Sequence, residues 1–160
     1  MLSQYVCDVP GKLAAVGLVA GIRAGVPKDD GNGPEADPAT CAPKKSVPII
    51  AFSGTADPVN PFDGGGAPYW KYGAQAAERQ WAKLDGCANK PKITRVAASI
   101  DRVSYGACAG GSTIEHYIVK NGGHVWPGSS NYLRQPKLGK VTFEINATDT
   151  MWTFFQRYKN

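Results

Sequence analysis

The feature that most constrains the fold is a pair of short, almost entirely apolar runs, Leu13–Ala20 and Val47–Phe52. Glycine bounds the first run, and the second leads into the turn that begins at Ser53. A near-continuous apolar run of this length is typical of a strand that is buried on both faces, and such strands belong to parallel sheets covered by helices. The two runs therefore predict an α/β fold.

The rest of the chain fits that fold class. Strand character recurs from Ile93 to Tyr105 and from Thr113 to Val119, whereas residues 21–46 are rich in Pro, Gly, Asp and Lys and predict a long loop. Three helices are expected: the tail of one at Met1–Asp8, one at Tyr69–Leu84 and one at Ala147–Tyr158. We expect one 160-residue domain of mostly parallel strands flanked by helices.

The two later helices contain three of the four tryptophans. Asn146 is a plausible N-cap for the last helix. The apolar spacing predicts that these side chains pack in the core: Trp70, Trp81, Met151, Trp152, Phe154 and Phe155.

Charge and length exclude several kinds of protein. The chain has 18 basic and 13 acidic residues and a net charge of +5, but the charges are scattered, which argues against a nucleic-acid-binding surface. No apolar stretch approaches the roughly 20 residues needed to span a bilayer. The glycines at 64–66 lack the Gly-Lys-Ser/Thr of a phosphate loop, and we expect neither a cofactor nor a metal site.

One of only two histidines, His124, lies just past a predicted strand, in the turn Gly122–Gly128. Asp57 lies just past the strand Val47–Phe52. Ligands and catalytic side chains gather at the carboxyl ends of strands in an open α/β sheet. An acid followed by a histidine on strand-end loops is the Asp…His part of a hydrolase triad in the order Ser…Asp…His.

Each of these residues also has a simpler interpretation. Asp57 precedes a proline and could be a turn residue, and Asp63 is a rival acid, although it lies beyond the turn among glycines. His116 alternates with isoleucines in a strand, so we interpret it as a packed or surface residue. Trp126 is either a core residue or a platform for an aromatic or acyl group beside His124.

The four cysteines are Cys7, Cys41, Cys87 and Cys108. None forms a Cys-x-x-Cys pair, and only two histidines accompany them, so disulfides are favoured over zinc and three pairings are open. Two disulfides predict an oxidising compartment, and we expect a secreted or periplasmic protein. The first residues do not form a signal peptide, which suggests that the chain begins partway through a longer protein.

Seven landmarks in the same order resemble the secreted polyhydroxybutyrate depolymerase and feruloyl esterase family, whose members are α/β-hydrolases with a serine nucleophile. The landmarks are Cys7-Asp8-x-Pro10, Ala20-Gly21, Gly54-Thr55-Ala56-Asp57-Pro58, Gly86-Cys87, Cys108-Ala109-Gly110-Gly111, Gly122-Gly123-His124-x-Trp126-Pro127-Gly128 and Ile145-Asn146-Ala147-Thr148.

The resemblance implies a function and several residue roles. It makes Asp57 the triad acid, His124 the triad base, and an ester of a polyester or an acylated polysaccharide the substrate. It also implies the disulfides Cys7–Cys41 and Cys87–Cys108. The chain would then be the C-terminal part of the hydrolase sheet, equivalent to strands 6 to 8 of that fold.

The sequence departs from the family pattern at the nucleophile, because no serine lies in a Gly-x-Ser-x-Gly frame. We therefore expect a C-terminal fragment without its serine. The alternative is a catalytically silent scaffold or binding remnant. In either case the strand Leu13–Ala20 would become a sheet edge, which could pair with a second copy of the chain.

Overall fold

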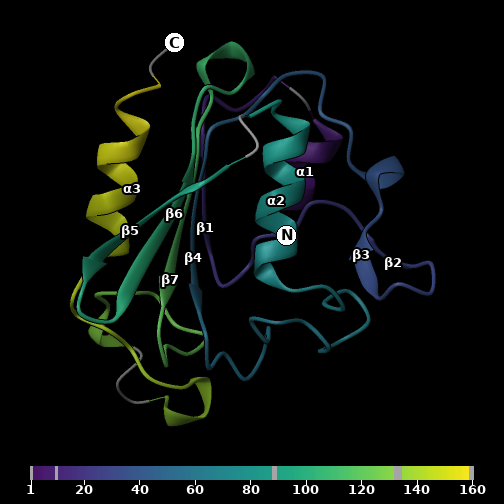
Figure 1. Cartoon of the computed structure of the whole chain (residues 1–160). Helices are drawn as coiled ribbons and strands as arrows, with labels where there is room; N and C mark the ends of the chain where they lie inside the picture. The colour runs from purple at the N-terminus through teal and green to yellow at the C-terminus, as the bar shows by residue number, and fades with distance from the viewer. Residues whose placement is uncertain (1, 10, 88–89, 132–134, 159–160) are drawn as a thin grey trace.

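The structure is a computed structural model that describes residues 2–9, 11–87, 90–131 and 135–158. Its main sheet has five strands: β1 (Val16–Val19), β4 (Ile49–Gly54), β5 (Lys92–Ala97), β6 (Ile100–Tyr105) and β7 (Ile114–Val119). Its helices are α1 (Leu2–Asp8), α2 (Ala74–Leu84) and α3 (Ala147–Phe155). The α/β architecture is as predicted, with α1 and α2 on one face of the sheet and α3 on the other (Figure 1).

The sheet is mixed, which differs from the mostly parallel sheet that we expected. The strand order is β1-β4-β7-β6-β5. The pairs β1–β4 and β4–β7 are parallel, whereas β7–β6 and β6–β5 are antiparallel. The reason is that the strand character between Ile93 and Tyr105 belongs to a hairpin, and a short turn between antiparallel strands replaces the crossover helix of a parallel pair.

The two central parallel strands divide the core into two layers. Every residue of β4 and β7 is buried, because helices cover both faces of these strands. Alternate side chains therefore enter different layers. Ile49 and Ala51 pack with the α1 and α2 side chains, whereas Ile50 and Phe52 pack with those of α3.

Helix α2 begins later than the periodicity predicts. Gly73 has an extended backbone, with φ −74° and ψ 168°, and Tyr72 pairs with Gly64 in an isolated bridge, so the residues before Ala74 are not helical. Trp70 and Trp81 are nevertheless buried as predicted. The Trp70 indole donates to the Pro61 carbonyl, 2.7 Å away.

The prediction that Trp152 packs in the core is wrong, because this side chain is 65% exposed. Helix α3 has a narrow buried stripe of Ala147, Met151 and Phe154, at the spacing of one helical face. Residue 152 lies about 100° around the helix from residue 151 and points away from the sheet. Phe155 is only partly buried, and Asn146 caps the helix as predicted.

Two smaller differences concern the N-terminal third of the chain. The predicted loop at residues 21–46 contains a hairpin of β2 (Pro27–Asp29) and β3 (Pro34–Ala36), outside the main sheet. The first helix is present as α1, although Met1, at which the predicted segment begins, lies outside the described residues.

Candidate active site

Asp57 is held in a tight turn directly after β4. One carboxylate oxygen, Oδ1, accepts hydrogen bonds from the backbone N–H groups of Val59 and Asn60, both at 2.8 Å. The carboxylate side chain is only 2% exposed. Because Oδ1 is occupied by the turn, the other oxygen, Oδ2, is aimed away from it in a fixed direction.

His124 supplies the partner of that second oxygen. Its ring nitrogen Nδ1 lies 2.9 Å from Oδ2 of Asp57, although the two residues are 67 positions apart in the sequence. The imidazole is 31% exposed. The bond to Asp57 uses Nδ1, and among the described residues Nε2 has no hydrogen-bond partner.

Glycines at both turns allow the two loops to approach each other this closely. A Cβ atom on Gly54 would lie 2.2 Å from the carbonyl oxygen of Gly122, closer than any real contact. A backbone hydrogen bond of 2.9 Å from Ala56 to that same carbonyl joins the loops. The absence of a side chain at Gly54 therefore helps to bring Asp57 close to His124.

The opposite side of the histidine turn is also fixed by backbone contacts. The N–H of His124 donates to the Leu138 carbonyl at 2.6 Å, and that of Gly123 donates to the Lys140 carbonyl at 2.9 Å. The turn is thus held from both sides before any substrate binds.

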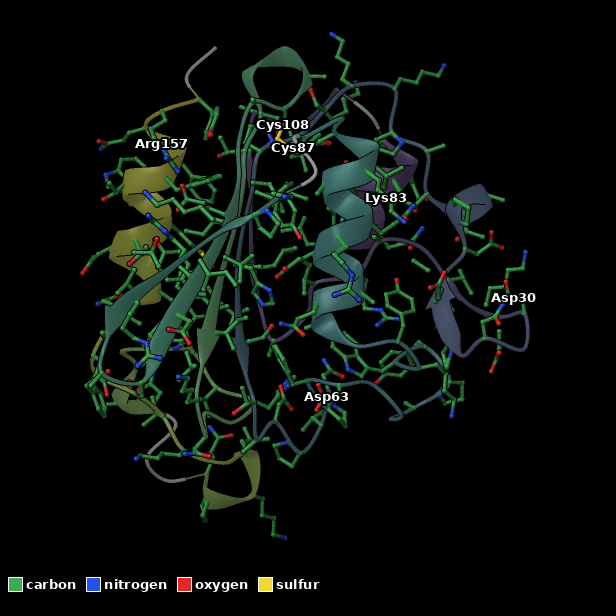
Figure 2. All side chains as sticks on the ribbon, in the orientation of Figure 1. Asp30, Asp63, Lys83, Cys87, Cys108 and Arg157 are labelled. Carbon is green, nitrogen blue, oxygen red and sulfur yellow. A yellow bond between two sulfur atoms is a disulfide. The ribbon has the colours of Figure 1, made fainter. Side chains whose placement is uncertain are left out.

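Asp63, the rival acid, takes no part in this pair. It is exposed, and Figure 2 shows it on the segment that leads away from the Asp57 turn toward α2. His124 bonds to Asp57 instead.

Trp126 lies close to His124 in the sequence, but it lines a groove to which neither Asp57 nor His124 contributes. This groove, of about 570 Å³, is otherwise polar, and Trp126 closes one wall by donating from Nε1 to Thr148 Oγ1 at 3.0 Å. The structure therefore brings the acid and the base together, whereas the half-buried tryptophan lines a separate groove.

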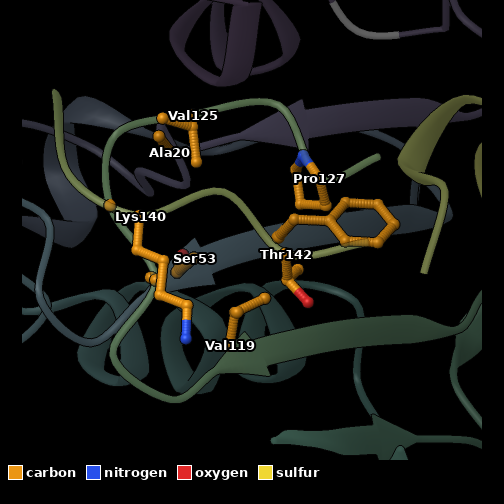
Figure 3. Close-up of a pocket in the computed structure, with 11 residues that line it drawn as sticks. Ala20, Ser53, Val119, Val125, Pro127, Lys140 and Thr142 are labelled. Carbon is orange, nitrogen blue, oxygen red and sulfur yellow. The ribbon is translucent and has the colours of Figure 1, made fainter. Parts of the chain in front are cut away.

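A small cavity lies beneath the two loops (Figure 3). Its volume is about 10 Å³, and it is enclosed by Val119, Val125, Pro127 and Thr142 together with the turn glycines. This is about the space of a single water probe, so the cavity cannot serve as an acyl pocket.

Both disulfides are present and paired as the resemblance implies, Cys7 with Cys41 and Cys87 with Cys108. The second joins the end of α2 to the segment before β7. In Figure 2 it lies at the opposite end of the sheet from Asp63 and the loops around it. This second disulfide therefore stabilises the fold at the end of the sheet away from Asp63.

The core contains a buried chain of polar side chains that was not predicted from the sequence. His116 on β7 is fully buried, with Nδ1 2.5 Å from Glu78 Oε2 and Nε2 2.9 Å from Ser53 Oγ. Glu78 is a charged residue of α2, yet it lies four residues after Ala74 and three before Trp81, on the buried stripe. That spacing was the available signal.

A second buried carboxylate lies at the other end of the sheet. Asp85 is fully buried, accepts a hydrogen bond from Ser112 Oγ at 2.6 Å and faces the N–H of Val47 at 3.3 Å. Burial raises the pKa of Asp85 from 3.8 to about 6, and the two hydrogen bonds oppose this shift only in part.

In the described ranges, no cluster of three His, Cys, Asp or Glu side chains is arranged to hold a metal ion. No helix in this part of the chain combines the length and the apolar character needed to cross a membrane.

Comparison with known proteins gives one partial match. No family model matches the sequence. The chain is 32% identical over 94 residues to feruloyl esterase B of Piromyces equi, and this match covers 55% of the chain but only 17% of that relative. The match supports a relation to an esterase family and gives no support to a relation with polyhydroxybutyrate depolymerases.

Proposed function

We propose that this chain carries the acid and base of a serine-dependent carboxylic-ester hydrolase. The observation that supports this most is the 2.9 Å hydrogen bond between Asp57 and His124, on the loops that follow two adjacent parallel strands. The partial similarity to a feruloyl esterase supports the same reaction class independently.

In the proposed mechanism Asp57 accepts from Nδ1 of His124 and so fixes the tautomer in which Nε2 can take a proton. As a serine hydroxyl attacks the ester carbonyl, its proton passes to Nε2, and Asp57 stabilises the imidazolium. His124 then gives this proton to the departing alcohol, leaving an acyl-serine. Water attacks the acyl-serine in the same way and releases the acid.

We propose that the serine comes from polypeptide outside these 160 residues. No described serine hydroxyl bonds to Nε2 of His124, and no serine of the sequence lies in a Gly-x-Ser-x-Gly frame. The relative is much longer than the matched region, which is compatible with a larger enzyme. By the same analogy we favour a feruloyl-type ester over a polyester, with Trp126 as a candidate platform for the substrate.

A silent scaffold that associates through its sheet edge is the alternative. Strand β1 is the outermost strand of the five, with β4 on its other side, so one row of its backbone groups has no strand partner in the main sheet. An open edge of this kind favours association. For the isolated chain we propose a homodimer through the edge near Leu13–Ala20. A stable monomer in sedimentation analysis would contradict the homodimer.

We also propose a secreted or periplasmic location. Two disulfides in a chain of this size are typical of proteins that fold in an oxidising compartment. Fractionation of the native host tests this, and recovery of the protein with reduced cysteines from the cytosol would overturn it.

Hydrolysis of methyl ferulate separates the two functions. The test compares the 160-residue chain with the longest in-frame product of its gene, each beside a His124→Ala variant. The hydrolase is supported if the longer product contains a Gly-x-Ser-x-Gly frame and loses its activity with His124→Ala. The scaffold is supported if the gene encodes no such frame and neither protein hydrolyses methyl ferulate faster than its own His124→Ala variant.

A further inference from the structure

The buried chain of Ser53, His116 and Glu78 joins α2 to the two strands that lead into the acid and base loops. The three residues are 7%, 0% and 3% exposed. Nδ1 of His116 bonds to the Glu78 carboxylate and Nε2 bonds to the Ser53 hydroxyl, so both ring nitrogens have a hydrogen-bond partner.

Filling a core with such a chain of polar side chains is energetically unfavourable compared with apolar packing. Burial removes hydration from every polar atom, and well-packed apolar side chains of similar volume are often at least as stabilising. What a fully satisfied polar network adds is a defined relative position for the elements that it joins. The elements that this network joins are therefore informative.

The Ser53–His116 hydrogen bond crosses the same two strands that carry the acid and the base. Ser53 is the penultimate residue of β4, four positions before Asp57, and His116 lies in the middle of β7, eight positions before His124. The strands pair in parallel with Ser53 opposite Ile118, so Ser53 and His116 are diagonal neighbours on one face.

The other contacts of His116 tie this pair to α2 and to the segment that leaves the Asp57 turn. Glu78 belongs to α2, and its carboxylate fixes the far side of the ring. The ring of Phe62 lies 6.2 Å from that of His116, and the Phe62 carbonyl accepts from the N–H of Ala74, the first residue of α2. The imidazole thus bonds to α2 through Glu78 and lies near Phe62, in the segment between Asp57 and α2.

We infer that Ser53, His116 and Glu78 are positioning residues that set the spacing of the Asp57 and His124 loops. This inference rests on the function proposed above for those two residues. The network acts through the ends of β4 and β7 and touches no substrate. If the network only stabilised the core, breaking the network would leave the hydrogen bond between Asp57 and His124 unchanged.

The test uses the ring N–H resonances of the 160-residue chain, which contains only two histidines. We expect a slowly exchanging, downfield Nδ1–H resonance for His124 in the parent chain, because that proton is held by Asp57. Ser53→Ala removes a hydrogen-bond partner of His116 and should broaden or abolish the His124 resonance. Glu78→Ala breaks the chain at its other end, and it replaces Ser53→Ala if that variant does not fold.

Ser112→Ala is the matched control. Ser112 is as deeply buried as Ser53 and also donates to a buried group, the Asp85 carboxylate, but it lies just before β7 begins, at the opposite end of the strand. We expect this variant to keep the His124 resonance despite a similar loss of thermal stability. Glu78→Gln retains an oxygen acceptor for His116 and should also keep it.

Two outcomes would overturn the inference: the resonance persists in Ser53→Ala and Glu78→Ala, or it is lost equally in Ser112→Ala. Because the measurement involves no ester, the absence of hydrolysis leaves it unaffected. A parent chain without the Nδ1–H resonance would count against the acid–base pair itself, and therefore against the proposed function.

Discussion

Asp85 makes the stability of this protein depend on pH in a direction that is unusual for an aspartate. Its pKa is raised from 3.8 to about 6 by burial, so the folded state holds a proton that the unfolded state has released between these two values. Stability contributed by this group is complete below pH 3.8 and is lost as the pH rises through about 6.

The size of the effect follows from the shift. A difference of about two pKa units corresponds to about 3 kcal/mol, at 1.36 kcal/mol for each unit. The Asp85→Asn variant keeps an oxygen that can accept from Val47 and an amide that can donate to Ser112, but it cannot ionise. Relative to the parent chain, it should therefore gain about 3 kcal/mol of stability between pH 4 and pH 7.5.

Urea unfolding followed by tryptophan fluorescence measures this quantity, with the disulfides kept intact. The difference between the two proteins at each pH is the relevant value, because the titration of all other groups cancels in it. A difference that stays constant from pH 4 to pH 7.5 would refute the argument. A change in the opposite direction would mean that the hydrogen bonds outweigh burial.

Three further perturbations test the fold and the site. Gly54→Ala should lower the free energy of unfolding by about 1 to 3 kcal/mol, because the added Cβ would meet backbone atoms. Gly106→Ala should leave it unchanged, because a Cβ there meets nothing within 4 Å. Chemical denaturation compares the two variants. Replacing Cys7 and Cys41 with serine opens a loop with a separation of 34 residues and should cost about 4 kcal/mol, which calorimetry measures. Asn146→Ala removes the acceptor of two backbone N–H groups and should cost about 1 kcal/mol; an unchanged melting temperature would contradict the cap.

The parts of the site that the sequence predicted depend on strand ends. Asp57 and His124 each follow a recognisable apolar strand, and the carboxyl ends of adjacent parallel strands share one edge of the sheet. That rule was sufficient to pair them. The disulfide pairing came from the family resemblance, because four cysteines alone allow three pairings.

The parts that the sequence did not predict depend on tertiary partners. A charged residue on an amphipathic helix is ordinarily on the solvent-facing side, so although the spacing of Glu78 puts it on the buried stripe, its partner His116 on β7 could not be predicted. For Trp152 the error was the opposite one, because a residue predicted to be buried is exposed. Helix α3 has only one sheet-facing stripe, and nothing requires that a large aromatic residue lie on it. The direction of β5 and β6 was missed because the turn between them carries no strong hairpin signal.

The most direct test of the central claim is the effect of Asp57→Asn on ester hydrolysis by the serine-containing product of the gene. Asparagine keeps the shape of the side chain but no longer enforces the tautomer in which Nε2 of His124 accepts a proton. We predict that kcat falls by on the order of 10⁴-fold while KM changes little, as expected for the acid of a serine triad. A kcat within tenfold of the parent value would contradict the assignment of Asp57 and His124 as acid and base.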